Sequence, residues 1–452
     1  MTSSLRASCV FLVMTACGSF SLARAGVAGA GAKAPVDGPV VAAAPAVDWW
    51  TGEGVSLGNV LFPHFHFNAV YGGTTSERGH ELGAGHHDPV EDGWTVQGFE
   101  LGLSARVSEY FEAYGTYHGY WENEDPNDYD GVFEEWFGKF KNLPGGLELR
   151  GGRYLNRFGF HNSSHLHSWD WVDNFLANGR FLGDDGQYSI GGEVTWTVPT
   201  PWTSLFTVSV GEAQMEAHEE EEVGAAEDHG HEAEHGHEEA AFHGEDALFA
   251  DVLTTAQWTH LWNWNDFHQF RGGASGAWGD NAAGSSTQLY GVHFQYEWRQ
   301  NGLEAGGAYL RWRTEVLLRD FELTAHEDEH SEHEEEQGGH EEDHADHEDD
   351  HSEHEASLGT FDDWGFYTSL TYGHPLGSAV IEASLRQEYV SGVAEAGLSE
   401  RWRLSPGVTW FANSQRTFFI RGQYNHDRFE DSSSEDSVWI GFGFNWGGPE
   451  VR

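Results

Sequence analysis

The clearest pattern in the chain is a strict alternation of apolar and polar residues over segments of about ten residues. Residues 437–446 place aromatic and aliphatic side chains on one face of a strand and serine, glycine and asparagine on the other. The same period of two recurs over 288–299, 379–389 and 417–427. Such alternation, with the apolar face outward and the polar face inward, is what the strands of a membrane barrel require.

Extending this search along the chain predicts sixteen strands. They lie near 61–71, 94–107, 110–121, 131–140, 147–159, 187–198, 202–212, 247–262, 267–278, 286–299, 303–318, 363–374, 378–390, 401–412, 417–429 and 437–446. An open sheet edge in lipid would leave backbone groups unpaired, so these strands must close on themselves. We therefore predict an all-β fold, a transmembrane antiparallel β-barrel of about 16 strands that occupies residues 48–452.

The connections between the predicted strands alternate between short and long. The short ones read SE, KNLPGG, PTP, NDF, QNG, PLG and NSQR, and the long ones include 72–93, 160–186, 213–246, 319–362 and the acidic EDSSSED. Bacterial outer-membrane barrels have short periplasmic turns and long outer loops, so this alternation predicts which end faces outward. A secreted β-sandwich is the soluble alternative. It does not explain the alternating loop lengths or the aromatic residues at both strand ends.

The first residues of the chain are typical of an export signal. Residues 1–25 combine Arg6, an apolar segment and the small-x-small sequence Ala23-Arg24-Ala25, which predicts a cleaved signal peptide. Residues 26–47 are rich in Ala, Gly, Pro and Val and are expected to form a flexible periplasmic leader. Both cysteines lie in the predicted signal, so we expect a mature chain without a thiol. Lipidation at Cys17 is the alternative.

The formal net charge of −51 disfavours nucleic acid as a partner, because phosphate contacts need clustered Lys and Arg. The sequence has no phosphate-binding loop, and we expect a protein that is not an enzyme. No stretch after the signal is apolar enough for a transmembrane helix. The partner that remains is the lipid bilayer of the outer membrane.

Two tracts, 216–246 and 326–355, consist largely of histidine and carboxylate residues without any Lys or Arg. They lack apolar periodicity, so we expect disordered, solvated loops on the outer side of the barrel. Imidazole beside carboxylate suits zinc and similar divalent cations, which such loops would bind weakly and at many positions. The candidate ligands in the tracts are His229, His231, His235, His237, His330, His333, His340, His344, His347, His351 and His354.

The loop at 160–186 differs from the tracts because aromatic and aliphatic residues alternate with its histidines. A loop this apolar is expected to fold inward, into the barrel mouth or lumen. His165, His167, Asp170 and Asp173, with His161 nearby, are suitable zinc ligands in type and number. The alternative is a constriction loop that these side chains hold by hydrogen bonds.

Strand parity also predicts which charged residues line the lumen. The predicted lumen residues carry both signs of charge: Arg106, Arg311, Arg313, Arg386, Arg421, Glu100 and Glu382. They are interpreted either as paired charges that keep the wall polar or as an arginine lane for anions. His64 and His66 share one strand face, which we expect to be the lumen face, and His118 and His293 are further candidates for the lumen.

The block GLELRGGRYLNRFGFHNSSHLHSWDWVDN, followed by FLGDDGQYSIGGEVTWTVP, resembles small outer-membrane proteins labelled zinc-regulated TonB-dependent receptors. The shared features are a Gly-Arg-aromatic strand motif, an N-x-x-H-x-H-x-W stretch with a later Asp, a D-D-G and a strand ending in Pro. In this chain they are Gly152, Arg153, Tyr154, Asn162, His165, His167, Trp169, Asp173, Asp184, Asp185, Gly186 and Pro199. The resemblance implies a porin-like barrel tied to zinc supply.

The chain departs from a true TonB-dependent receptor, since it has no room for a plug domain and no convincing energy-coupling box. TonB coupling is therefore doubtful, and passive or facilitated passage is the better interpretation. We predict a channel for divalent metal uptake, with zinc as the expected ion and no catalytic cofactor. The alternatives are an anion porin of the phosphate type and a surface metal-buffering or adhesin protein anchored by the barrel. Sequence leaves the oligomeric state open.

The alternation of loop lengths gives a test of orientation. Protease added to intact cells should cleave within 216–246 and 326–355 and should leave the PTP and QNG turns intact, because only the long connections face outward. Mass spectrometry of the released peptides would measure this. Protection of both tracts until the outer membrane is broken would show that the orientation is reversed.

Overall fold

The computed structural model describes residues 50–52, 55–75, 82–89, 92–121, 129–214, 244–302, 306–324, 358–447 and 450. The chain divides after Pro45 into two units, and all of these residues belong to the second. The predicted signal and leader lie outside the described residues, as do the two tracts apart from residues 244–246. No described helix is long and apolar enough to cross a membrane.

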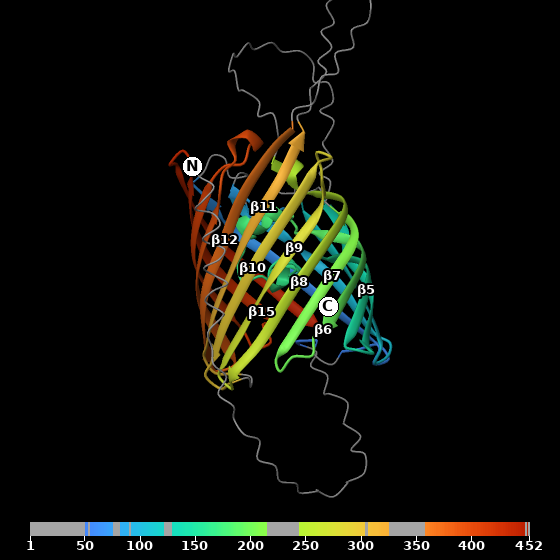
Figure 1. Cartoon of the computed structure of the whole chain (residues 1–452). Coiled ribbons are helices and arrows are strands. Elements are labelled where there is room, and N and C mark those ends of the chain that lie inside the picture. Colours follow the sequence, from blue (N-terminus) through green and yellow to red (C-terminus); the bar gives the residue numbers. More distant parts are fainter. Residues whose placement is uncertain are drawn as a thin grey trace, which may run out of the picture. The chain divides into compact units, whose positions relative to one another are not determined.

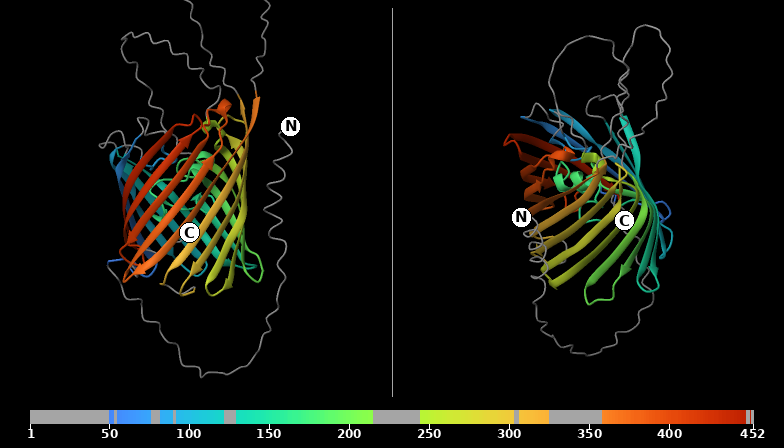
Figure 2. Two further views of the ribbon diagram at one scale, coloured as in Figure 1. Left: turned by 90° about the vertical axis from the view of Figure 1, so that its left-hand side faces the viewer. Right: turned by 45° about the horizontal axis from the view of Figure 1, so that its top comes forward.

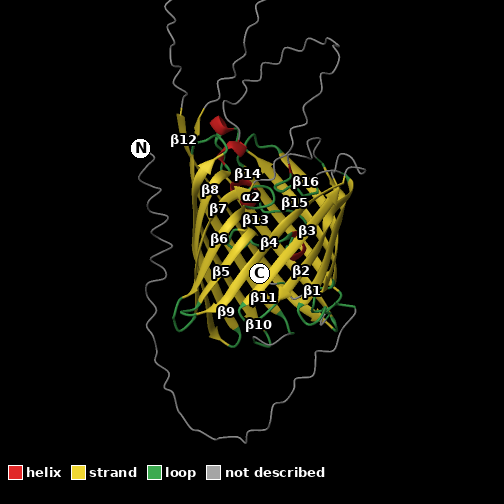
Figure 3. Cartoon of the chain, turned by 90° about the vertical axis from the view of Figure 1, so that its right-hand side faces the viewer, coloured by secondary structure: helices red, strands yellow, loops and turns green. Residues whose placement is uncertain are grey.

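Sixteen strands form one closed barrel in which every neighbouring pair is antiparallel (Figures 1 and 3). The strands are β1 (Leu61–Thr74), β2 (Gly93–Arg106), β3 (Phe111–Trp121), β4 (Tyr129–Leu143), β5 (Leu147–Leu155), β6 (Tyr188–Thr197), β7 (Thr203–Gln214), β8 (Phe249–Asn265), β9 (His268–Asn281), β10 (Ser286–Arg299), β11 (Tyr309–Thr324), β12 (Leu358–Leu376), β13 (Ala379–Val390), β14 (Arg401–Phe411), β15 (Phe418–Phe429) and β16 (Ser434–Gly447). Pairing of β1 with β16 closes the barrel. The predicted fold class is confirmed.

The alternation along β14 shows how the sequence sets the two faces. Leu404 and Val408 are exposed on the outer surface, whereas Arg403 and Ser405 are buried on the inner side. This arrangement is the reverse of a soluble protein, whose apolar residues face inward. It fits a barrel surrounded by hydrocarbon.

Several strand ends differ from the prediction. β5 ends at Leu155, before the predicted end at 159, because the chain leaves the wall there and turns inward. β11 starts at Tyr309 rather than 303, while β11 and β12 both extend beyond the predicted ends, to Thr324 and from Leu358. Their added residues still pair across the ladder.

The connections alternate as predicted, with the longest ones at the same end of the barrel. The segments between β5 and β6, between β7 and β8 and between β11 and β12 are all at this end. At the other end the connections are short, such as the one between β8 and β9. We call these ends the long-loop end and the short-turn end.

Residues 156–187, the inner segment, connect β5 to β6 and lie inside the barrel (Figure 2, right). The segment contains two short helices, η2 (Leu166–Ser168) and α2 (Leu176–Leu182). It hydrogen-bonds to strands around the whole wall. Leu176 N donates to Glu388 on β13, Phe160 N donates to Glu315 on β11, and Gln97 on β2 donates to the Val172 carbonyl.

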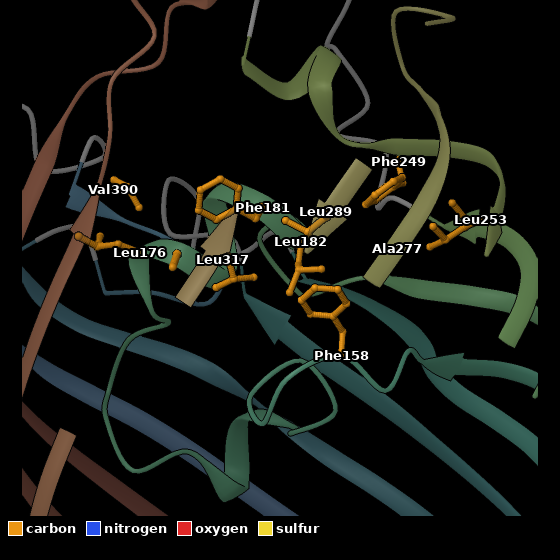
Figure 4. Packing of buried hydrophobic residues seen from close by; sticks show 12 residues of the cluster. Phe158, Leu176, Phe181, Leu182, Phe249, Leu253, Ala277, Leu289, Leu317 and Val390 are labelled. Atoms are coloured by element: carbon orange, nitrogen blue, oxygen red, sulfur yellow. The ribbon is translucent and has the colours of Figure 1, made fainter. Parts of the chain in front are cut away.

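An apolar core holds one side of the inner segment against β8–β13 (Figure 4). Phe158 and the α2 residues Phe181 and Leu182 pack on inward-facing apolar side chains of the wall, which include Phe249, Leu253, Ala277, Leu289, Leu317 and Val390. Complete burial of each large apolar side chain contributes about 1.5–3 kcal/mol. Since α2 is only seven residues long, this packing rather than intrinsic helix propensity stabilises it.

A buried ionic network holds another side of the segment against β13–β15. Asp173 accepts hydrogen bonds from Arg386 (2.7 Å) and Arg403 (3.0 Å). Its two oxygens also accept from Gln423 (2.7 Å) and Asn425 (2.9 Å). Burial would raise the pKa of Asp173, but Arg386 and Arg403 hold this pKa below its usual range. The carboxylate is therefore charged and fully satisfied.

Replacing Asp173 with Ala should loosen the inner segment and leave the barrel closed. Removing one partner of a buried ionic network costs about 3–5 kcal/mol. We expect the lower part of this range, because Arg386 retains Glu388 and Arg403 retains Asp427. Hydrogen exchange of the segment's amides should become about a hundredfold faster. The exposed Glu395→Ala is the control, and equal exchange in both variants would contradict a role for Asp173 in holding the segment.

Candidate metal centre

A β-bulge on β4 places two adjacent glutamates inside the barrel. Glu135 lies opposite Thr116 of β3, but the next pair is Phe133 with Tyr117, so Glu134 is an extra residue. In a regular strand Glu134 and Glu135 would point to opposite faces. The bulge re-aims one of them, and both are buried.

His165 of the inner segment reaches these glutamates. Its Nδ1 lies 2.7 Å from Glu134 Oε2 and 3.4 Å from Glu100 Oε2, and its Nε2 lies 2.8 Å from Glu135 Oε2. Ligand atoms of Glu100, Glu134 and His165 lie within 4.8 Å of one another, and all three residues are buried. We call this group the Glu100 site.

His167 connects this site with the end of the chain. Its Nδ1 lies 2.8 Å from Glu100 Oε2, and its Nε2 lies 3.2 Å from Glu450 Oε1. The ring stacks on His66 at 3.6 Å between centroids. Burial alone would lower the pKa of His167, but the carboxylates of Glu100 and Glu450 raise it to about 9. The protonated ring balances part of the negative charge.

The chemistry of the Glu100 site fits a borderline divalent cation. Two carboxylates and one imidazole supply the oxygen and nitrogen ligands that Zn²⁺ takes, whereas Ca²⁺ and Mg²⁺ prefer oxygen alone. Neighbouring Glu135 contacts the other nitrogen of His165, as outer partners of a metal-bound imidazole do.

Only part of the predicted ligand group comes together. Asp170 lies 2.8 Å from Arg311 and 3.6 Å from Arg313. Asp173 belongs to the arginine network on β13–β15, and His161 Nε2 lies 2.9 Å from Asn174 Oδ1. The prediction that His165, His167, Asp170 and Asp173 form one ligand set does not match this geometry. After η2 the segment turns toward arginines that pair with both aspartates, while the strands supply glutamates to the histidines.

The predicted lumen residues contact inner groups, mostly in pairs of opposite charge. Arg421 donates to the carbonyls of Trp169 and Trp171, while Arg386 contacts Asp173. The remaining pairs are Arg311 and Arg313 with Asp170, Arg416 with Glu382, and Arg106 with Glu112 at 4.0 Å. The interpretation of paired wall charges agrees with these contacts.

Burial lowers the pKa of two inner histidines that lie outside the strands. Burial and the positive charge of Arg313 lower the pKa of His161 to about 3, so its ring is neutral. Burial and the neighbouring His118 and His86 hold the pKa of His87 well below its usual range. His87 Nε2 lies 3.3 Å from Asp185 Oδ1.

The tract histidines predicted as ligands all lie outside the described residues, so their metal binding stays a prediction. The tracts also contain four H-E-x-x-H spacings, which begin at His231, His326, His340 and His347. Zinc hydrolases use this spacing on a helix, where residues i and i+4 share a face. In these low-complexity segments the spacing follows from the abundance of His and Glu, and the expectation of a non-enzyme is unchanged.

Sequence reasoning missed Glu134, Glu135 and Glu450 as members of the centre. Glu134 and Glu135 are adjacent polar residues that break the alternation of their strand, and this break is the signal that could have revealed the bulge. Glu450 carries no local signal, because it follows the last strand and reaches His66 only through barrel closure.

Comparison with protein-family models finds no match. An uncharacterized protein of Aquifex aeolicus is 31% identical over 141 residues, which are 30% of this chain and only 28% of that protein. Solved structures similar to the chain include OprB of Pseudomonas putida at high pH (TM-score 0.49, 10% identity, 86% of this chain and 95% of that one). Others are the outer-membrane channel DcaP of Acinetobacter baumannii (0.47, 10%, 85% and 96%) and an anion-selective porin from Comamonas acidovorans (0.44, 12%, 85% and 98%).

The raised pKa of His167 makes the stability of the metal-free protein depend on pH. Because this pKa is about 9 when folded and near 6.5 when unfolded, the stabilisation is complete below about pH 6.5 and is lost as pH rises through about 9. Unfolding midpoints measured with chelator present should therefore fall from pH 7 to 9.5 more steeply in the wild type than in His167→Gln. Parallel curves would show that His167 carries no such charge.

Proposed function

We propose that the protein is an outer-membrane, porin-like channel that binds divalent cations in its lumen and lets them pass, with zinc as the principal candidate. The observation that carries this proposal is the Glu100 site, where Glu100, Glu134 and His165 meet inside a closed barrel. Passage would be passive or facilitated, since the chain offers no convincing element for energy coupling.

The outer surface supports insertion in a membrane. Large apolar and aromatic side chains are exposed on the strands, for example Trp258 on β8, Trp312 on β11 and Leu370 on β12. In water such a surface would be an extended hydrophobic patch. In a bilayer it faces hydrocarbon, with tryptophan and tyrosine suited to the interfaces.

The two acidic histidine tracts would act before the ion reaches the lumen. Both belong to connections at the long-loop end, which we infer to be the outer side. Their carboxylates would raise the local concentration of cations by electrostatic attraction. Binding would be weak at the tracts and tighter at the Glu100 site, so the affinity for the ion would increase from the outer side toward the lumen.

An anion channel is the second candidate, and Arg271 is the observation that favours it. Among the described residues, no carboxylate lies within 4 Å of this guanidinium, which contacts the ring of Phe160. Burial lowers the pKa of Arg157, and Glu193 lies 3.5 Å from its guanidinium. Arg271, Arg157 and Arg313 together could give a polyatomic anion a path along the lumen.

The combined variant Glu100→Gln, Glu134→Gln should lose tight zinc binding and remain a folded barrel. Glutamine keeps the size of each side chain but removes the charge and one carboxylate oxygen. We expect zinc affinity, measured against a competing chelator, to fall at least about 10- to 100-fold. Glu212→Gln, an exposed residue of β7, is the matched control. Unchanged tight binding in the double variant would contradict the proposal.

Reversal potentials in planar bilayers separate the two candidates. A salt gradient of zinc chloride should give a cation-selective potential in the wild type, reduced in the double variant. An anion-selective potential that disappears in Arg271→Ala would favour the second candidate instead.

A further inference from the structure

His64 and His66 present two imidazoles to the lumen from the first strand. They are two residues apart on β1, so they share a face, and both are buried. Glu450, which follows β16, lies 3.0 Å from His66 Nε2 and 3.6 Å from His64 Nδ1 through its Oε1. Ligand atoms of the three residues lie within 4.8 Å of one another. We call this group the His64 site.

The His64 ring is held in place without any hydrogen bond to its nitrogens. It is 3% exposed, and neither Nδ1 nor Nε2 has a hydrogen-bond partner among the described residues. The ring stacks on Tyr114 at 5.5 Å and 9°, and it lies against Gly102, where any side chain would clash with it. A buried polar group without a hydrogen-bond partner destabilises a fold, so the retention of this histidine here calls for an explanation.

His167 contacts carboxylates of both sites. One of its nitrogens lies beside Glu100 and the other beside Glu450, at 2.8 and 3.2 Å. Its ring also lies flat on that of His66. A cation that leaves the Glu100 site toward the short-turn end would therefore meet His167 and then the His64 site.

We propose that His64, His66 and Glu450 form a second divalent-cation site, and that His167, which releases its proton to solvent when it acts as a ligand, transfers the ion between it and the Glu100 site. This inference rests on the proposed function for the direction of transfer. Two imidazoles and one carboxylate are ligands typical of zinc, and an ion would satisfy one of the two orphaned nitrogens of His64. The pair of sites would let an ion move by exchanging one or two ligands at a time, without being released into the lumen.

The first experiment counts tightly bound ions. Full-length protein in detergent would be loaded with zinc and equilibrated with a chelator strong enough to strip the weak tract sites, and the retained zinc would be measured by mass spectrometry. We expect two ions per wild-type chain and one in His64→Ala, His66→Ala. Glu450→Gln, which leaves β1 intact, should also weaken one ion at least about tenfold. His260→Ala, a histidine stacked on Trp262, is the matched control and should retain both.

The outcomes distinguish the two proposals. One retained ion in the wild type, unaffected by His64→Ala, His66→Ala but lost in Glu100→Gln, Glu134→Gln, would overturn the His64 site and leave the proposed function standing. No retained ion in the wild type would overturn both. Two ions that persist in both His64-site variants would also overturn the assignment.

The second experiment tests transfer. His167→Gln should retain two ions but slow zinc entry into liposomes loaded with a fluorescent zinc indicator, by at least about tenfold. His161→Gln, in the same segment and hydrogen-bonded to Asn174, is the control and should transfer zinc at the wild-type rate. Wild-type rates in His167→Gln would overturn the transfer role while the second site remains.

Discussion

Closure of the sheet, which pairs every strand edge through backbone hydrogen bonds, is the constraint on which the rest of the structure depends. A sheet in hydrocarbon cannot leave an edge unpaired, so β16 must return to β1. This pairing makes neighbours of the two ends of the barrel and places Asn445 and Glu450 beside His66. Closure also divides each strand into a lipid face and a lumen face, and the lumen of a sixteen-stranded barrel is wide enough to need filling or water.

The inner segment fills that space by matching three different walls. Its apolar side chains pack against β8–β13, its aspartates pair with arginines of β11, β13 and β14, and its histidines meet glutamates of β2 and β4. Each of these sets of contacts fixes a different part of the segment, so together they define one orientation of the segment in the lumen. The metal-ligating chemistry is confined to one sector, because the other sectors are occupied by packing and by ion pairs.

Sequence predicted the wall much better than the centre, and the reason is physical. A strand residue in this barrel has only two environments, lipid or lumen, so a period of two is enough to find strands such as β14 to within about a residue. The centre depends on which lumen residues meet across the barrel. Asp173 could have joined His165, but arginines 213 and 230 residues away are its partners. Glu134 lies inside the barrel because of a β-bulge. Strict alternation along the strand would place Glu134 and Glu135 on opposite faces, so the sequence pattern alone does not predict that both lie inside.

The long sequence separations within the lumen also bear on the order of assembly. The inner segment leaves the barrel wall at Leu155, but residues that hold it, such as Arg386 and Arg421, belong to strands that follow more than 200 residues later. Such non-local contacts form late, after the intervening chain has been ordered. The arginines of β13–β15 can therefore hold the segment only after these late strands have joined the wall. A half-assembled wall would have glutamates on β2 and β4 before the segment is held in place, so the candidate Glu100 site is complete only in the finished barrel.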